Sequence, residues 1–342
     1  MTTLPLQSST ASGRLTWRIL LDKLGPLLGL LFVFGLFAIL SPLRTGRNTF
    51  VTLDNAEMIL RLTAVVGIAA VGMTLIVISG GIDLSVGPVI ALTTVVIALL
   101  LQRGHSATTA ALGGVAAAAG CGLITSQIIT RLKLPPFIAT LGMWASVRGL
   151  AKEFADNRTV YPPSAWQDTW LNGLLNTMPA GKRWMLVPTG VWVMIISGIL
   201  MGLMLRYTRL GRHIIAVGSN EQTARLCGVR VEQVKLIVYV LGAAFAGLAG
   251  IVEFSYISTG DPTTRSGAEL DVIAAVFIGG ASISGGYGSV FGSLVGAVMM
   301  SMLDNGCTKM DWPNSRQQIA TGAIIIIAVA LDRLRHPPEL KG

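Results

Sequence analysis

Long apolar stretches, separated by short polar segments, run from Pro26 to Leu331. The hydrocarbon core of a bilayer is about 30 Å thick and needs roughly 20 helical residues to cross it. The stretches 24–40, 59–79 and 187–205 come close to that length. Because the segments between them are too short to build a soluble core, these stretches are expected to be membrane spans. A content of 52% hydrophobic and 13% charged residues agrees with this interpretation.

The pattern predicts an all-α polytopic membrane protein with about ten transmembrane helices, some of them broken by glycine. The expected spans are 24–41, 58–79, 82–101, 107–130, 137–151, 187–205, 236–257, 270–279, a further piece that ends at Leu303, and 319–331. The 40 glycines of the chain suit close helix packing in lipid. No small-x-small cleavage site follows the first stretch before Ser41, so an uncleaved first span is expected.

Basic residues indicate the orientation. The net charge is +9, but Lys and Arg lie in short loops and are not interleaved with aromatic residues, which favours a membrane protein over a nucleic-acid-binding one. The strongest basic block runs from Arg206 to Lys235. Lys and Arg in short loops stay in the cytoplasm. We therefore expect one transmembrane domain over 24–332, cytoplasmic tails at 1–23 and 333–342, a cytoplasmic loop at 206–235 and a periplasmic loop at 152–186.

Several chemistries are not indicated by any motif. Cys121, Cys227 and Cys307 are far apart and have no C-x-x-C spacing, so neither a disulfide framework nor a zinc site is expected. The sequence has no phosphate-binding G-x-x-x-x-G-K-[ST], no H-E-x-x-H and no G-x-S-x-G. We therefore expect a non-catalytic chain with no metal and no cofactor.

The first informative motif is Gly80-Gly81-Ile82-Asp83-Leu84-Ser85-Val86-Gly87-Pro88, between two expected spans. Two glycines allow a tight reversal, and Asp83 can cap the free N–H groups of the next helix. A purely structural cap is one interpretation. The other is that an ionisable residue at membrane depth is costly and often marks a pathway or a moving element. Candidates for a structural or gating role are Gly80, Gly81, Asp83, Ser85 and Gly87.

The second motif lies in the basic loop. The segment Ser219–Gly228 predicts a short helix in which Asn220 caps the start, Glu221 and Arg225 suit the helix dipole, and Gly228 ends it. An ordinary capped loop helix is one interpretation. The spacing of Glu221, Ala224 and Gly228 also fits a small, stiff knob on the cytoplasmic face.

The third motif runs from Glu269 to Gly280 and continues into more serine and glycine. Asp271 is expected to cap the outer end of the span, and Gly279 with Gly280 allows a broken helix of the kind that transporters use beside a cavity. Tight helix packing is the alternative. The segment Gly279–Gly286 also echoes Gly80–Gly87, sharing Gly, Gly, Ser and Gly in register, and the span count places both on the cytoplasmic side.

Three stretches together carry a family resemblance. They are Gly72–Gly87, Thr208–Gly228 and Glu269–Gly286. The chain resembles, from about residue 20 to 332, the membrane permease subunits of bacterial ABC importers of the ribose type, a family with permeases for ribose, xylose, arabinose, galactose and the sugar-like autoinducer-2.

The resemblance implies the ABC importer permease fold in the bacterial inner membrane. Its implied partners are a second permease subunit, a cytoplasmic ABC ATPase, a periplasmic sugar-binding protein and the lipid bilayer, with no nucleic acid. ATP hydrolysis would belong to the ATPase partner. Residues of the 206–235 loop that match the family's reduced ATPase-docking segment are Glu221, Ala224 and Gly228, together with the helix residues Asn220 and Arg225.

The solute that this family implies is neutral and rich in hydroxyl groups, so its route needs small polar side chains without charge. Candidates for this substrate pathway are Thr74, Ser79, Gln127, Thr140, Ser282 and Ser284. An ion-coupled carrier would more often bury carboxylates within its spans. Two functions therefore stay open: the permease subunit of an ATP-driven sugar importer, and a stand-alone ion-coupled secondary carrier or channel.

Overall fold

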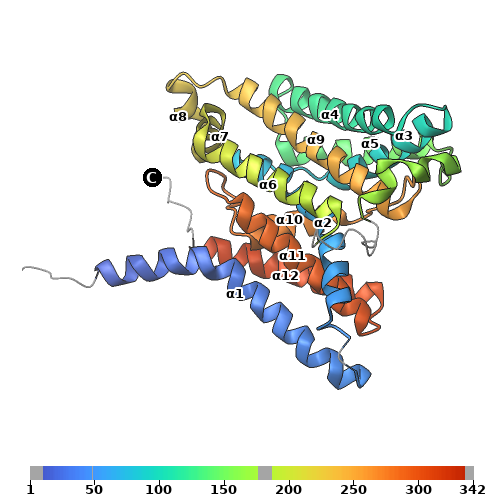
Figure 1. Cartoon of the computed structure of the whole chain (residues 1–342). Helices are drawn as coiled ribbons and strands as arrows, with labels where there is room; N and C mark the ends of the chain where they lie inside the picture. The colour runs from blue at the N-terminus through green and yellow to red at the C-terminus, as the bar shows by residue number, and fades with distance from the viewer. Residues whose placement is uncertain (1–10, 48, 176–186, 336–342) are drawn as a thin grey trace, which may run out of the picture.

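A computed structural model describes residues 11–47, 49–175 and 187–335. In this part of the chain the fold is all-α, with twelve α-helices and two short 3₁₀ helices (Figure 1). The helices are α1 (Ala11–Thr45), α2 (Leu53–Ile78), α3 (Val86–Gln102), α4 (Ala107–Arg131), α5 (Pro136–Phe154), η1 (Ser164–Asp168), η2 (Trp170–Gly173), α6 (Thr189–Tyr207), α7 (Arg209–Ser219), α8 (Glu221–Leu226), α9 (Val231–Ile257), α10 (Ala268–Ile278), α11 (Val290–Lys309) and α12 (Asn314–Arg335). The all-α prediction is confirmed.

The expected count of about ten membrane spans is not confirmed. Each expected span coincides with a helix, and the remaining two helices, α7 and α8, lie in the basic loop. In the described ranges, however, six segments are long and apolar enough to cross a bilayer: Gly25–Leu43 within α1, and α2, α4, α6, α9 and α11. Helix α3 is apolar but has 17 residues, and the glycine break leaves α10 with 11. The chain is a multi-pass membrane protein.

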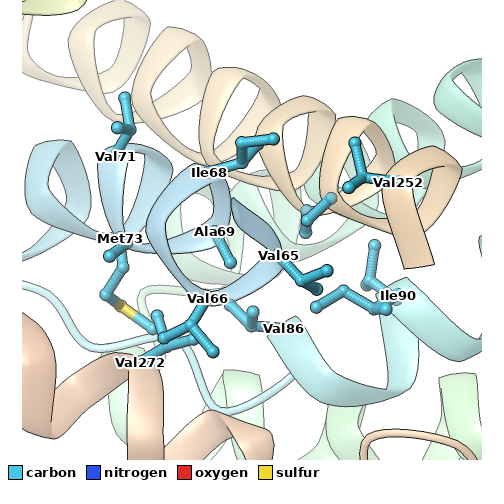
Figure 2. Packing of buried hydrophobic residues seen from close by; sticks show 14 of the residues in the cluster. Val65, Val66, Ile68, Ala69, Val71, Met73, Val86, Ile90, Val252 and Val272 are labelled. Carbon is cyan, nitrogen blue, oxygen red and sulfur yellow. The ribbon is translucent and has the colours of Figure 1, made fainter. Parts of the chain in front are cut away.

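Helix α2 forms the centre of the bundle. In its most apolar window 89% of the residues are buried, and it packs against α6, α9, α10 and α11. Figure 2 shows side chains from all round α2 meeting those of its neighbours, with Val252 on α9, Ile90 on α3 and Val272 on α10. A helix that is apolar on every side is buried on every side. Helix α9 therefore covers one side of α2, with α3 and α4 packed on α9 and α5 packed on α3 and α4. Helices α10 and α11 cover another side, and α12 packs on these two (Figure 1).

Small residues bring these helices close together. A Cβ on Gly72 of α2 would lie 2.8 Å from the carbonyl oxygen of Gly242 on α9. One on Gly122 of α4 would overlap the carbonyl of Tyr239 on α9. Membrane helices gain their association from such close backbone packing.

The bundle has two distinct ends. Helices α7 and α8 lie at one end, together with the N-terminal end of α1 and the C-terminal end of α12 (Figure 1). The loop after α5 lies at the opposite end and packs on the α9–α10 loop. There, Val160 and Gly260 form a single β-bridge, and Arg148 donates a 2.9 Å hydrogen bond from Nη1 to the carbonyl of Pro262.

Candidate functional site

The reversal between α2 and α3 begins with a left-handed glycine. Gly80 has φ +85°, and the N–H of Gly81 donates to the carbonyl of Ile76 at 2.9 Å, as in a Schellman helix end. A Cβ on Gly81 would overlap Tyr239 Oη, and one on Gly87 would overlap Glu269 Oε2. Glycine at Gly80 is required by the backbone conformation, whereas at the other two positions it is required by space.

Asp83 is buried in this reversal, with 2% of its surface exposed. Its Oδ1 accepts hydrogen bonds from the backbone N–H of Ser85 at 2.8 Å and from Ser85 Oγ at 2.6 Å. Ser85 is the N-cap residue of α3, and its own side chain makes no capping bond. The expectation that Asp83 caps the helix is wrong in detail, because Asp83 holds the turn before the first helical residue.

The reversal between α10 and α11 repeats the same geometry. Gly280 has φ +89°, and the N–H of Ala281 donates to the carbonyl of Val276 at 3.1 Å. Gly80 therefore corresponds to Gly280, one residue away from the register in which the two sequences echo each other. A Cβ on Gly279 would overlap the backbone of Gly292, so this glycine lets α10 approach α11.

Asp271 does not cap α10. The N-cap residue is Gly267, with φ +90°, and it makes no side-chain cap bond. Asp271 lies inside the first turn of the helix. The helix starts at Ala268, earlier than the sequence indicates, because the left-handed Gly267 ends the preceding loop.

Both reversals meet the C-terminal end of α7. The N–H of Gly286 donates to the carbonyl of Ile78 at 2.8 Å. A Cβ on Gly218 would overlap that same carbonyl, and one on Gly285 would lie 2.8 Å from the carbonyl of Gly218 and 2.9 Å from the Cα of Gly80. We call Gly80, Gly218, Gly285 and Gly286 the glycine junction, and the end of the bundle that holds it the junction end.

Helix α8 projects from the junction end as a short capped helix. Asn220 Oδ1 accepts from the N–H of Thr223 at 2.8 Å, which caps its start. Gly228 has φ +83°, and the N–H of Val229 donates to the carbonyl of Ala224 at 3.0 Å, which closes its end. Asn220 is also the C-cap residue of α7, so the two helices share one capping residue.

Two ion pairs hold α8 against the start of α9. Lys235 Nζ lies 2.7 Å from Glu221 Oε2, and Arg225 Nη1 lies 2.6 Å from Glu232 Oε1. The hydrogen bond to Glu232 raises the pKa of Arg225, so this guanidinium stays charged. Because Arg225 and Glu232 are both 53% exposed, water and salt screen this pair.

The side chains of α8 correct one expectation and add one residue. Ala224 is 4% exposed and faces the bundle, so it does not provide the small docking surface expected of it. Leu226 is 89% exposed at the tip of the helix. An apolar side chain in an otherwise polar loop helix was the available signal for Leu226. Gly218 was not among the predicted site residues, although it belongs to the stretch Thr208–Gly228 that carries the family resemblance.

The six pathway candidates are not brought together. The hydroxyl group of Thr74 donates to the carbonyl of Ala70 at 2.6 Å, that of Ser79 to Ile76 at 2.8 Å, and that of Thr140 to Ile82 at 3.1 Å. Ser282 is buried and Ser284 is exposed in the α10–α11 loop. Gln127 lies on α4. Cavities of about 820, 840 and 610 Å³ lie among the described residues, and none of the six candidates lines any of these.

Metal ligands are not clustered in the described ranges, where no group of three His, Cys, Asp or Glu side chains could hold an ion. Of the cysteines, Cys227 is exposed at the junction end, whereas Cys121 and Cys307 are buried. The arrangement consists of a projecting helix, a residue shared by α7 and α8, and a junction between two helix reversals.

Residues 55–329 match the family described as the branched-chain amino acid transport system / permease component. The chain belongs to this family of ABC importer permeases. Over 332 residues the permease is 36% identical to the ribose import permease protein RbsC of Escherichia coli strain K12, covering 97% of this chain and 100% of that protein.

Other relatives are named as permeases for different sugars. The L-arabinose ABC transporter permease protein AraH of Azospirillum brasilense is 32% identical over 84% of this chain and 82% of its own length. The fructose import permease protein FrcC of Rhizobium meliloti is 34% identical over 81% of this chain and 77% of its own length. No solved structure matches this permease.

Proposed function

We propose that the chain is the permease subunit of an ATP-driven importer in the bacterial inner membrane and forms the route of a monosaccharide or sugar-like solute. Its proposed partners are a second, identical or homologous permease, a cytoplasmic ABC ATPase and a periplasmic sugar-binding protein. The names of the ribose, arabinose and fructose permeases among its relatives support a sugar as the solute.

The observation that carries this proposal is the course of α7 and α8. Helix α8 projects with Leu226 at its tip, and α7 ends against both reversals at the glycine junction. A displacement of α8 by an ATPase would therefore move the end of α7, and with it the α2–α3 and α10–α11 reversals. The backbone atoms at the junction are in direct contact, and closely packed interiors are hard to compress. A displacement of α7 is therefore transmitted to the two reversals.

The docking surface that we assign to the ATPase includes Leu226, Gln222 and Arg225. A hollow of about 610 Å³ lies between α8 and the α4–α5 loop, lined by Gln222 and Arg225 on one side and by Lys133 and Pro135 on the other. Burying a leucine stabilises an interface by about 1.5–3 kcal/mol, which is about tenfold to a hundredfold in affinity. Leu226 is thus the anchor in this proposal, and Ala224 is the small residue that lets α8 sit close to the bundle.

The proposed orientation puts the junction end, with 1–23, 206–235 and 333–342, in the cytoplasm. The opposite end, with loop 152–186, faces the periplasm. The basic block from Arg206 to Lys235 supports this assignment. We further propose that the pathway residues Thr74, Ser79, Gln127, Thr140, Ser282 and Ser284 face the solute when the reversals move.

ATP turnover by the reconstituted complex tests the proposal. Wild-type complex should hydrolyse ATP faster when the binding protein carries its sugar, and uptake should require ATP. Leu226→Ser should weaken ATPase association about tenfold or more and remove the stimulation, whereas Leu226→Met should keep both. Sugar uptake by the chain alone, driven by an ion gradient and independent of ATP, would contradict the proposal and favour the stand-alone carrier.

A further inference from the structure

A cavity of about 840 Å³ lies at the end of the bundle opposite the glycine junction, and most of the residues that line it are polar. We call this end the pocket end. The start of α2, the end of α11, the end of α9 and the loops after α1 and α9 enclose the cavity. Its lining includes Asn55, Tyr256, Arg265, Ser301 and Asn305. Its volume is within the range of about 300–1,000 Å³ typical of small-molecule sites.

Four lining residues each hold a buried polar atom that has no hydrogen-bond partner among the described residues: Asn55 Oδ1, Arg265 Nε, Ser301 Oγ and Asn305 Oδ1. Asn55 is 3%, Ser301 2% and Asn305 6% exposed. The amide nitrogen of Asn55 donates to the carbonyl of Phe50 at 2.9 Å, so the oxygen is the atom of this side chain that lacks a partner. The four atoms expose almost no surface, even toward the cavity, so each meets a ligand only after its side chain turns. A buried polar atom without a partner is costly, and a ligand that these side chains turn toward would remove that cost.

These atoms come from three separate segments and complement one kind of ligand. Ser301 and Asn305 are one turn apart on α11, so they share a face of that helix. Two amide oxygens accept, the Arg265 nitrogen donates, and the serine hydroxyl does both. A sugar hydroxyl also donates and accepts, whereas a simple ion does only one of these.

The charges around the cavity favour a neutral occupant. Three basic residues, Arg47, Arg265 and Lys309, and two acidic ones, Asp54 and Asp304, line it. Glu253, which is 3% exposed, lies 2.6 Å from Arg265 and offsets the third positive charge. The lining is therefore close to electrically balanced, and a neutral, hydroxyl-rich ligand needs no counter-ion there.

We propose that this cavity is a sugar-binding subsite within a single permease subunit, where the solute rests at the pocket end before it crosses. When the sugar binds, the side chains of Asn55, Ser301 and Asn305 turn toward the cavity and hydrogen-bond the sugar hydroxyls, and the buried Glu253 holds Arg265 beside the sugar. This inference rests on the proposed function, which makes the solute a sugar and the pocket end the side from which it arrives.

The number of sugar molecules moved per ATP hydrolysed tests the subsite. Asn305→Leu keeps the volume of the side chain but removes its polar atoms, and Ser301→Ala is the milder variant. Each should lower sugar per ATP, about tenfold for Asn305→Leu, while stimulated ATP hydrolysis persists. Ser126→Ala is the matched control, because this buried serine on α4 already donates to the carbonyl of Leu123 at 2.7 Å. An unchanged ratio in Asn305→Leu would overturn the subsite and leave the proposed function intact.

A second measurement does not depend on ATP coupling or on the stability of these variants. Thr308→Cys places a thiol on the exposed rim of the cavity, in a chain whose own cysteines are changed to serine. D-ribose, L-arabinose or D-fructose should slow its reaction with a thiol reagent at least about twofold compared with an equal osmolarity of sodium chloride. Equal rates with all three sugars and with salt would overturn the subsite, even if ATP-driven uptake is found.

Discussion

The two ends of the bundle differ in the kind of contact that they contain. At the junction end, backbone touches backbone: the carbonyl of Ile78, the C-terminal end of α7 and the loop at Gly285 meet without side chains between them. At the pocket end, polar side chains enclose a cavity of about 840 Å³. The difference matches the proposed division of labour. A junction that passes on movement needs contact without slack, whereas a site that receives a solute needs space and hydrogen-bonding groups.

The same contrast holds for the ion pairs. Arg265 and Glu253 at the pocket end and Arg225 and Glu232 at the junction end have the same separation of 2.6 Å. Glu253 is 3% exposed, whereas both partners of the other pair are 53% exposed. Breaking a buried pair leaves an uncompensated charge, but an exposed pair is replaced by water. The two pairs have the same separation, but their different burial predicts unequal effects of breaking them.

The largest expected effect is that of Gly218→Ala at the junction. The added Cβ would overlap the carbonyl of Ile78, and backbone cannot move aside as a flexible side chain does. We expect strain above about 3 kcal/mol and uptake below about 1% of wild type. Uptake in proteoliposomes is the measurement.

A glycine on α4 gives the matched control for this change. A Cβ on Gly120 meets no atom of the described residues within 4 Å, and Gly120 is inside a helix. Gly120→Ala should keep uptake and stabilise the helix by about 0.5–1 kcal/mol. Equal uptake by Gly218→Ala and Gly120→Ala would mean that the junction is not a tight contact.

The next effect is at the pocket end, on stability. Glu253→Gln should lower the stability of the permease by about 3 kcal/mol, because it leaves Arg265 as a poorly compensated charge. The melting temperature in detergent would report this loss. Adding Arg265→Met should recover much of it, since a buried pair can be replaced by apolar groups. A melting temperature that stays at the wild-type value in Glu253→Gln would show that water already satisfies Arg265.

A smaller effect is expected at the end of α8. Gly228 has φ +83°, which costs an alanine about 1–2 kcal/mol and an asparagine less. Gly228→Ala should therefore speed amide hydrogen exchange over 223–229, and Gly228→Asn should do so less. The reverse order of the two variants would contradict the left-handed helix end.

The smallest effect concerns the exposed ion pair. Glu232→Gln should change ATPase association and uptake by less than about twofold, because water and salt already screen Arg225. Titration of the ATPase onto the reconstituted permease measures this. A loss as large as that expected for Leu226→Ser would mean that Glu232 itself contacts the partner.

The sequence predicted what local patterns control. The stretches of apolar residues predicted the helices, and the order Asn220, Glu221, Gly228 predicted a short capped helix, because caps and left-handed glycines act within a few residues. It failed on Ala224, which is buried, and on Asp271, which does not cap. Which side of a short helix faces the bundle depends on α7 and α9, and no local signal in α8 reports that.

The sequence also did not predict the contacts between segments that are far apart in the chain. The glycine junction joins residues near positions 80, 218 and 285, and any one of these glycines alone indicates only flexibility. The pocket end was missed for the same reason. Ser301 and Asn305 are ordinary polar residues on α11 until the fold brings Asn55 and Arg265 to the same cavity.

The sidedness of the two ends is the most direct test of the account. Cys227 is an exposed native thiol at the junction end, and Asp168→Cys adds one in η1 at the opposite end. In cells whose outer membrane has been made permeable and whose inner membrane is closed, a membrane-impermeant thiol reagent should label Asp168→Cys. It should not label Cys227 until the inner membrane is opened. Labelling of Cys227 but not of Asp168→Cys while the inner membrane is closed would place the junction in the periplasm and contradict the account.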